Sequence, residues 1–275
     1  MLQAPPRTAL SGPALIRLLA RLADADIPES RQSLSDRLSQ WLGWTDAIAL
    51  SSALNGNPPA VAAGGRVFGS AEEADYVRAR SSLAKAITGD SVFAAARRHG
   101  HGHGHGHGHA HGHGHGAAHA PSRIAPTEPA ADYAVFRQRY LALQQSMETG
   151  IGNLRGRLRA MLAARTPAMA RLAVVDAVME RALSERERNL LAAVPGLLAG
   201  HFERLRAAEQ AVLTAAEAEA AASGDSAGDA TGDATPVTPG AWLNLFRKDM
   251  QSVLLAELDI RLQPVEGLLA ALRAS

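Results

Sequence analysis

Histidines separated by single glycines are the most distinctive chemical feature of the sequence. Imidazole is a borderline ligand for Ni, Zn, Co and Cu, and intervening glycines let several rings converge on one ion. The candidate metal ligands are His99, His101, His103, His105, His107, His109, His111, His113, His115 and His119. Because a flexible tract imposes no coordination geometry and fixes no tautomer, we expect adventitious, non-selective binding of Ni, Zn, Co or Cu and no required cofactor.

The histidine tract has three interpretations. The simplest is a solvent-exposed linker expanded by repetition, whose metal affinity is incidental. A physiological metal buffer is the first alternative. A pH sensor is the second, because unperturbed histidines gain charge between roughly pH 7 and 5.5. A structural zinc site is not supported, since it needs mixed, well-spaced ligands on folded elements.

His201 is the single histidine outside the tract. His201 and Glu203 could serve as a base and its orienting carboxylate, but side chains two residues apart on a helix point away from each other. We therefore expect an exposed His201. The glycines at 64, 65 and 69 follow no predicted strand and precede no Lys-Ser or Lys-Thr, so no phosphate-binding loop is predicted.

Known catalytic patterns do not occur in the sequence. We find no serine nucleophile motif, no metalloprotease histidine pair and no carboxylates that can be placed across a cleft. The sequence therefore predicts no catalytic and no cofactor-binding residues, and a protein that is not an enzyme. An enzyme assembled from scattered carboxylates or arginines remains a third, minor reading.

Arginines make one predicted helix locally basic. They are Arg137, Arg139, Arg155, Arg157, Arg159 and Arg165. A phosphate-binding stripe is conceivable, because Arg155 and Arg159 share a helix face. However, no aromatic residues interleave for base stacking, and the formal net charge is only +1. A solvated or partner-facing surface is the ordinary interpretation, and no nucleic-acid partner is predicted.

Composition favours an all-α protein. Of 275 residues, 47% are hydrophobic but only 4% are aromatic, which suits helices packed through alanine and leucine. The absence of cysteine excludes disulfides and thiolate sites. No apolar run approaches the ~18 residues that span a bilayer, and Arg17 and Arg21 interrupt a signal-like N-terminal stretch. We expect a cytoplasmic protein without a membrane span.

Residues 1–98 are predicted to form a small N-terminal helical cluster. Leucines recur at helical spacing after Pro13, and Trp41 and Trp44 are expected near the centre of the cluster. Ser70 and Glu73 are predicted to form a capping box that opens another helix. Residues 99–130 lose all periodicity and are predicted to be a disordered His/Gly-rich linker.

Residues 131–216 are predicted to form a long antiparallel helical hairpin. Its first helix carries a heptad-like apolar seam comprising Tyr133, Phe136, Tyr140, Leu143, Met147, Ile151, Leu154, Leu158 and Met161. Thr166 and Pro167 supply a stop and a new start, and Pro195 with Gly196 kinks or breaks the second helix. The seam leaves open whether the bundle is intramolecular or a coiled coil with a second chain.

The C-terminal part follows the same logic. Residues 217–240 are predicted to be a disordered acidic linker. Residues 241–275 are predicted to form an amphipathic helix that packs on the hairpin, with a kink at Pro264. The predicted architecture is thus a small helical cluster followed by a coiled-coil-like antiparallel bundle.

Several segments resemble an uncharacterised proteobacterial family, the domain of unknown function 3348. The segments are Thr8–Pro13, Ile27–Leu38, Trp41–Asp46, His201–Leu205, Phe246–Met250 and Leu262–Leu269. The similarity extends over nearly the whole chain except the histidine tract and the acidic linker. It implies no catalytic residues. It does imply a cytoplasmic accessory of a cell-envelope assembly of the proton-channel type.

Binding therefore ranks above catalysis. We expect a non-enzymatic helical interaction or accessory protein that contacts a protein partner, or itself, through its long helices and docks on such an envelope assembly. The alternative is a metal-handling protein in which the His-Gly tract buffers Ni, Zn or Co.

Overall fold

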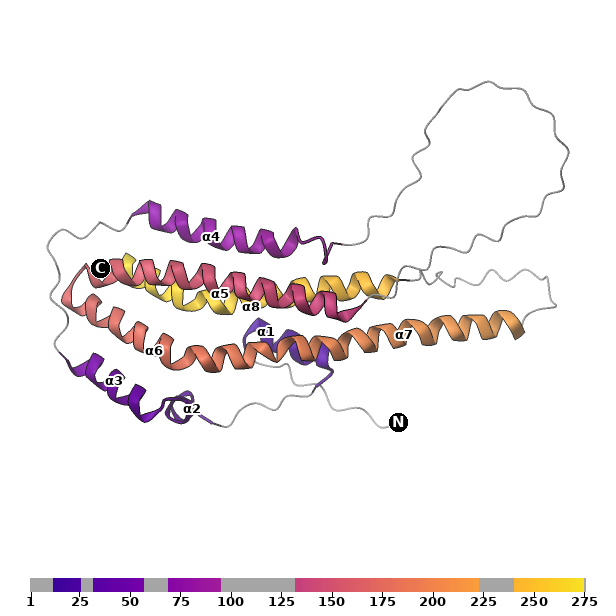
Figure 1. The fold of residues 1–275 in the computed structure, drawn as a ribbon, viewed down its shortest axis with the longest axis horizontal. Coiled ribbons are helices and arrows are strands. Elements are labelled where there is room, and N and C mark those ends of the chain that lie inside the picture. Colours follow the sequence, from indigo (N-terminus) through magenta and orange to yellow (C-terminus); the bar gives the residue numbers. More distant parts are fainter. Residues whose placement is uncertain (1–11, 26–31, 57–68, 95–131, 223–239, 275) are drawn as a thin grey trace, which may run out of the picture.

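The described part of the chain has only helical regular structure. The computed structural model describes residues 12–25, 32–56, 69–94, 132–222 and 240–274. Within them lie α1 Ala14–Ala23, α2 Leu34–Trp41, α3 Trp44–Asn55, α4 Ser70–Thr88, α5 Tyr133–Ala163, α6 Pro167–Ala192, α7 Val194–Ala222 and α8 Ala241–Arg273 (Figure 1). The predicted all-α class is confirmed for these ranges. None of the helices described is long and apolar enough to cross a bilayer.

Helices α5 and α6 form an antiparallel hairpin. The Asp132 carboxylate accepts a hydrogen bond from the Ala134 N–H at 2.8 Å and so caps α5. The Thr166 hydroxyl accepts one from the Met169 N–H at 3.2 Å and caps α6. Pro167 follows at the first helical position, where its missing N–H loses no helical bond. The predicted stop and new start at Thr166 and Pro167 are confirmed.

A proline explains the break between α6 and α7. Pro195 has no N–H to donate to the carbonyl of Leu191, four residues earlier. That carbonyl accepts a hydrogen bond from Gln144 Nε2 of α5 at 3.2 Å. The Tyr133 hydroxyl donates to the carbonyl of Pro195 itself. The predicted break is confirmed at Ala193, and α5 side chains bind the backbone on both sides of it.

Helix α8 runs parallel to α5 and lies beside it for most of its length (Figure 1). Phe136 meets Phe246, and Tyr140 bonds to Glu257, so positions advance in the same direction along both helices. Helix α8 continues through Pro264 as one helix. Parallel neighbours need a long connection, and here α6 and α7 provide it by running back along the bundle.

Helix α4 completes the bundle and runs antiparallel to α8. Arg273 bonds to Glu73 through two nitrogens at 2.6 and 2.9 Å, and Arg80 bonds to Asp259 at 2.8 Å. The capping box expected from Ser70 and Glu73 is wrong. The carboxylate that accepts the N-terminal Gly69 N–H, at 2.9 Å, belongs to Glu72. The chain forms the cap one residue earlier, and this leaves Glu73 for the ion pair with α8.

The first three helices do not gather into the expected N-terminal cluster. Helix α1 packs on α7 and α8, whereas α3 packs on α6. Trp44, expected near the centre of the cluster, is 82% exposed, and neither α2 nor α3 has a buried residue. The reason is that the long helices offer larger apolar surfaces than these short helices offer one another. We call residues 34–55 the α2–α3 arm.

The boundary predicted between the hairpin and the acidic linker also changes. Helix α7 continues to Ala222, so residues 217–222 are helical and not part of the linker that was expected from 217 to 240. The segment is rich in alanine and glutamate, which have high helix propensity and need little packing to remain helical. Residues 223–239, and the linker predicted for 99–130, lie outside the described residues.

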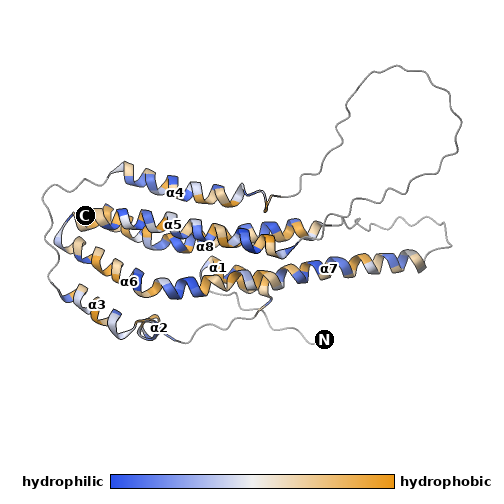
Figure 2. Cartoon of the chain, in the orientation of Figure 1, coloured by the Kyte–Doolittle hydropathy of each residue, from blue (hydrophilic) through white to orange (hydrophobic). Residues whose placement is uncertain are grey.

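The core lies mainly between α5, α7 and α8, and its aromatic side chains gather at one end. Apolar and polar residues are interspersed along these helices (Figure 2), and the buried apolar residues of all three pack together in one core. Phe246 is fully buried there, with ring centroids 5.0 Å from Phe202 and 5.4 Å from Phe136 in edge-to-face contacts. Tyr133 and Trp242 extend this aromatic cluster. The cluster fixes one end of the bundle.

Candidate functional site

The predicted metal ligands cannot be placed. His99, His101, His103, His105, His107, His109, His111, His113, His115 and His119 all lie outside the described residues. Among the residues that are described, no group of three or more His, Cys, Asp or Glu side chains could hold a metal ion. Metal binding by the tract therefore stays a prediction.

His201 is not exposed, which corrects the sequence-based expectation. Its side chain is 11% exposed, and its Nε2 lies 2.8 Å from Asp249 Oδ2 of α8. Its ring lies 6.0 Å from that of Phe246, at the edge of the aromatic cluster. Glu203, the partner considered from the sequence, is exposed. Because 48 residues separate His201 from Asp249, sequence spacing gave no signal for the pair.

A buried carboxylate joins α5 to α8, and sequence reasoning missed it. Glu257 is fully buried and accepts hydrogen bonds from the Tyr140 hydroxyl at 2.7 Å and from Gln144 Nε2 at 3.0 Å. Arg261, one turn further along α8, donates to it at 2.9 Å. The sequence did offer one signal for this site, a glutamate on the apolar face of the C-terminal helix four residues before an arginine. Burial is the largest of the causes that raise the pKa of Tyr140 far above its usual range. The charge and the hydrogen bond of Glu257 raise this pKa further.

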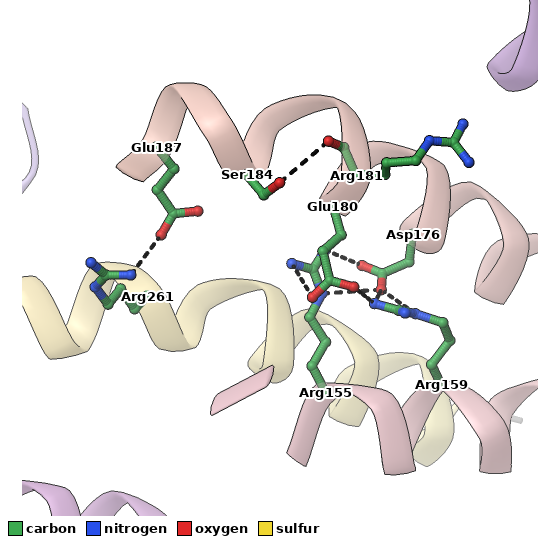
Figure 3. Close-up of polar contacts among 8 residues, drawn as sticks. All are labelled: Arg155, Arg159, Asp176, Glu180, Arg181, Ser184, Glu187 and Arg261. Carbon is green, nitrogen blue, oxygen red and sulfur yellow. Dashed lines mark hydrogen bonds and ion pairs between the residues drawn. The ribbon is translucent and has the colours of Figure 1, made fainter. Parts of the chain in front are cut away.

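Two arginines of α5 are paired with acids of α6, as Figure 3 shows. Arg155 binds both oxygens of Asp176, at 3.1 and 2.7 Å, and Arg159 binds Asp176 at 2.9 Å and also Glu180. Burial lowers the pKa of Arg159, but the hydrogen bonds to Glu180 and Asp176 outweigh it and leave the pKa raised. These two arginines already have carboxylate partners, which weakens the phosphate-stripe interpretation.

Other arginines of the predicted stripe also meet acids. Arg139 bonds to the buried Asp90, and Arg157 lies 3.8 Å from Asp75 of α4. The exposed Arg157–Asp75 pair contributes little stability, whereas the partly buried Arg155–Asp176 pair fixes how α5 and α6 lie against each other.

A groove opens between α6 and α8 over the surface of α5. Its volume is about 770 Å³, and we call it the α6–α8 groove. Its lining includes Ile151, Gly152, Met179, Leu183, Leu190 and Ile260. Arg261 Nη1 lies 3.3 Å from Glu187 Oε1, so one ion pair connects the two walls (Figure 3). Trp41 of α2 stands at the groove with the Arg186 guanidinium 4.7 Å from its ring centroid.

The chemistry of this groove suits packing more than proton transfer. Three of its guanidiniums, those of Arg155, Arg188 and Arg261, pair with carboxylates of the lining. The Ser184 hydroxyl donates to the Arg181 carbonyl of its own helix at 3.3 Å (Figure 3). The remaining lining is largely apolar. Such a surface can bind the apolar face of another helix.

These features define a helical-bundle protein with a groove beside an incompletely packed helical arm. A family model described as "Protein of unknown function (DUF3348)" matches residues 1–274, and the chain belongs to this family. The resemblance noted from the sequence is thereby confirmed. Neither the curated proteins nor the solved structures include a match.

Proposed function

We propose that this chain is a non-enzymatic helical interaction protein, an accessory that docks on a protein partner through the α2–α3 arm. The supporting observation is that α3 packs against the bundle on one side and exposes two large apolar side chains on the other. Ala49, Leu50 and Ala53 are half-buried towards α6, whereas Trp44 and Ile48 face outward, 82% and 50% exposed. Large apolar side chains that stand together on an exposed helix face commonly mark a surface for a protein partner.

The short length of the arm strengthens this reasoning. Helices α2 and α3 have 8 and 12 residues, and isolated helices of such length are marginal in water. Their stability must come from packing, yet neither has a buried residue. A bound partner would supply that packing. The family resemblance suggests a cell-envelope assembly of the proton-channel type as the place to look.

Cross-linking in the native cell tests this proposal. A photoreactive amino acid at position 44 or 48 is expected to trap a protein partner, identified by mass spectrometry. The matched control is position 77 on α4, where Val77 is also an exposed apolar residue, at 57%. Equal cross-linking at positions 44 and 77 would contradict the proposal. An envelope protein trapped only from the arm would support the accessory role.

The metal-handling alternative rests on the ten alternating histidines. If it holds, deletion of residues 99–119 lowers tolerance to excess Ni, Zn or Co. Unchanged growth under all three metals would count against it.

A further inference from the structure

We propose that the N-terminal half of α4, residues 70–80, is a salt-sensitive strap that detaches from α5 and α8 and uncovers apolar residues of α5. We call these residues the α4 strap. Helix α4 packs on α5 and α8, whereas α3 packs on α6, on the opposite side of the bundle (Figure 1). The inference therefore goes beyond the proposed function of the α2–α3 arm and does not depend on it.

The two halves of α4 are packed to different degrees. In the C-terminal half Ile87 is fully buried, and Phe93, shortly after the helix ends, is 2% exposed. Gln251 of α8 also donates a hydrogen bond to the carbonyl of Ile87 at 3.4 Å. In the strap, which the structure describes throughout, no apolar residue is buried, and Tyr76 is only partly so. The C-terminal half is therefore the anchor of α4.

Side-chain contacts near the surface hold the strap to α8. They are Arg273 with Glu73 at 2.6 and 2.9 Å, Arg80 with Asp259 at 2.8 Å, and Tyr76 with Glu266 at 2.5 Å. The side chains of the two ion pairs are between 37% and 59% exposed. Each pair therefore contributes little stability, and salt weakens it further by screening.

The strap covers a hollow on α5. The hollow has a volume of about 310 Å³, and we call it the α4–α5 hollow. Its lining includes Glu72 and Asp75 of the strap and Leu158 and Met161 of α5. Because side chains that face a gap lose the dispersion contacts that a packed neighbour would give, the hollow adds little attraction to hold the strap. Leu158, which is 2% exposed, is among the residues that detachment uncovers.

The junction between the two halves of α4 is suited to bending. Ser81 and Ser82 follow the strap directly, and both are exposed. Serine is less favourable in a helix than alanine, because its hydroxyl can bond to nearby backbone groups in non-helical conformations. A detached helix as short as the strap is marginal in water. Detachment therefore breaks the helical hydrogen bonds of the strap and is measurable as hydrogen exchange.

Hydrogen exchange with mass spectrometry on the full chain tests the strap. Between about 0.01 M and about 1 M salt the screening length falls from about 30 Å to about 3 Å. Over this range, exchange in residues 74–80 is expected to accelerate severalfold relative to α5. Exchange in residues 84–88 is expected to change little, because the anchor remains packed.

A triple variant of the strap tests the contacts with α8. Glu73→Gln/Tyr76→Phe/Arg80→Gln is expected to accelerate exchange in the strap about tenfold at low salt, because three weak pairs together amount to about that factor. It is also expected to lose most of the response to salt. The matched control is Arg78→Gln, because this strap arginine pairs with Asp75 of its own helix at 2.6 Å. The control is expected to behave as the wild type does.

Thiol labelling shows whether detachment uncovers α5. The chain has no cysteine, so a single introduced cysteine reports on one position. Leu158→Cys lies in the α4–α5 hollow, at a position that is 2% exposed. The matched control Leu143→Cys lies on the same helix, at a position that is 4% exposed, but outside the lining of the hollow. High salt is expected to accelerate labelling severalfold at position 158 relative to position 143, and the triple variant should do the same at low salt.

Exchange in the strap that does not respond to salt, or that the triple variant leaves unchanged, would overturn the proposal. Loss of protection in residues 84–88 together with the strap would also overturn it, because α4 would then open as a whole. Faster exchange in the strap with equal labelling at positions 158 and 143 would do so too, because the helix would then fray without uncovering α5.

Discussion

The aromatic end of the bundle and the α2–α3 arm both carry large apolar side chains, but they are packed to opposite degrees. At the aromatic end, Phe136, Phe202 and Phe246 are buried and in mutual contact. In the arm, Trp44 is largely exposed and no residue is buried. One region is completed within the chain, whereas the other has apolar surface that none of the described residues covers. The difference teaches that the fold covers its apolar residues unevenly, and the proposed function assigns the uncovered ones to binding.

The largest expected effect is on the aromatic end. Phe246→Ala removes a fully buried ring with three aromatic neighbours and is expected to destabilise the fold by about 4 kcal/mol, from lost burial and a new cavity. Trp44→Ala in the arm is expected to change the stability of the monomer by less than about 0.5 kcal/mol. Urea unfolding at low protein concentration measures both. Equal losses would remove the contrast between the two regions.

The buried carboxylate provides the next test. Glu257→Ala leaves the Arg261 guanidinium and the Tyr140 hydroxyl without their buried acceptor and is expected to cost about 3 kcal/mol. The matched control is Arg80→Ala, which breaks an ion pair exposed on both sides and should cost less than about 0.5 kcal/mol. The same unfolding experiment compares them. If Glu257→Ala is as mild as the control, the network does not hold α5 to α8.

Alkaline pH tests the aromatic end of the bundle through Tyr133, whose ionisation also removes its hydrogen bond to the Pro195 carbonyl. Burial raises the pKa of Tyr133 to about 12 from about 10 in an unfolded chain. The folded state therefore holds this proton more tightly, so the contribution is complete below pH 10 and is lost as the pH rises towards about 12. Melting temperatures between pH 8 and 12 should fall more steeply for the wild type than for Tyr133→Phe. If the melting temperatures of the wild type and of Tyr133→Phe fall equally with pH, the loss of stability does not come from Tyr133.

The smallest global effect is expected in the arm itself. Leu50→Ala trims the half-buried contact of α3 on α6 and should lower overall stability by less than about 1 kcal/mol, because little else depends on α3. Locally, amide hydrogens of α3 should lose the protection that they have. Hydrogen exchange followed by mass spectrometry reads α3 and α5 in one experiment. Slower exchange in α3 than in α5 in the wild type would contradict the proposed division.

Much of the fold was readable from residue patterns because helices are local structures. The apolar seam from Tyr133 onwards predicted α5, Thr166 and Pro167 predicted the start of α6, and Pro195 predicted the break before α7. The family resemblance was likewise carried by the residues alone and is confirmed by the match over 1–274. Spacing, caps and proline chemistry act within a few residues, so the sequence by itself determined these features.

What only the tertiary structure decided are the partnerships between distant residues. His201 was expected on the surface and instead binds Asp249, and Glu257 meets Tyr140 across 117 residues. Trp44 was expected inside and lies outside because α3 turns its other face to α6. Which face of a helix becomes buried depends on what the rest of the chain offers for packing. A periodic pattern states that a face is apolar, and the folded arrangement decides whether anything covers it.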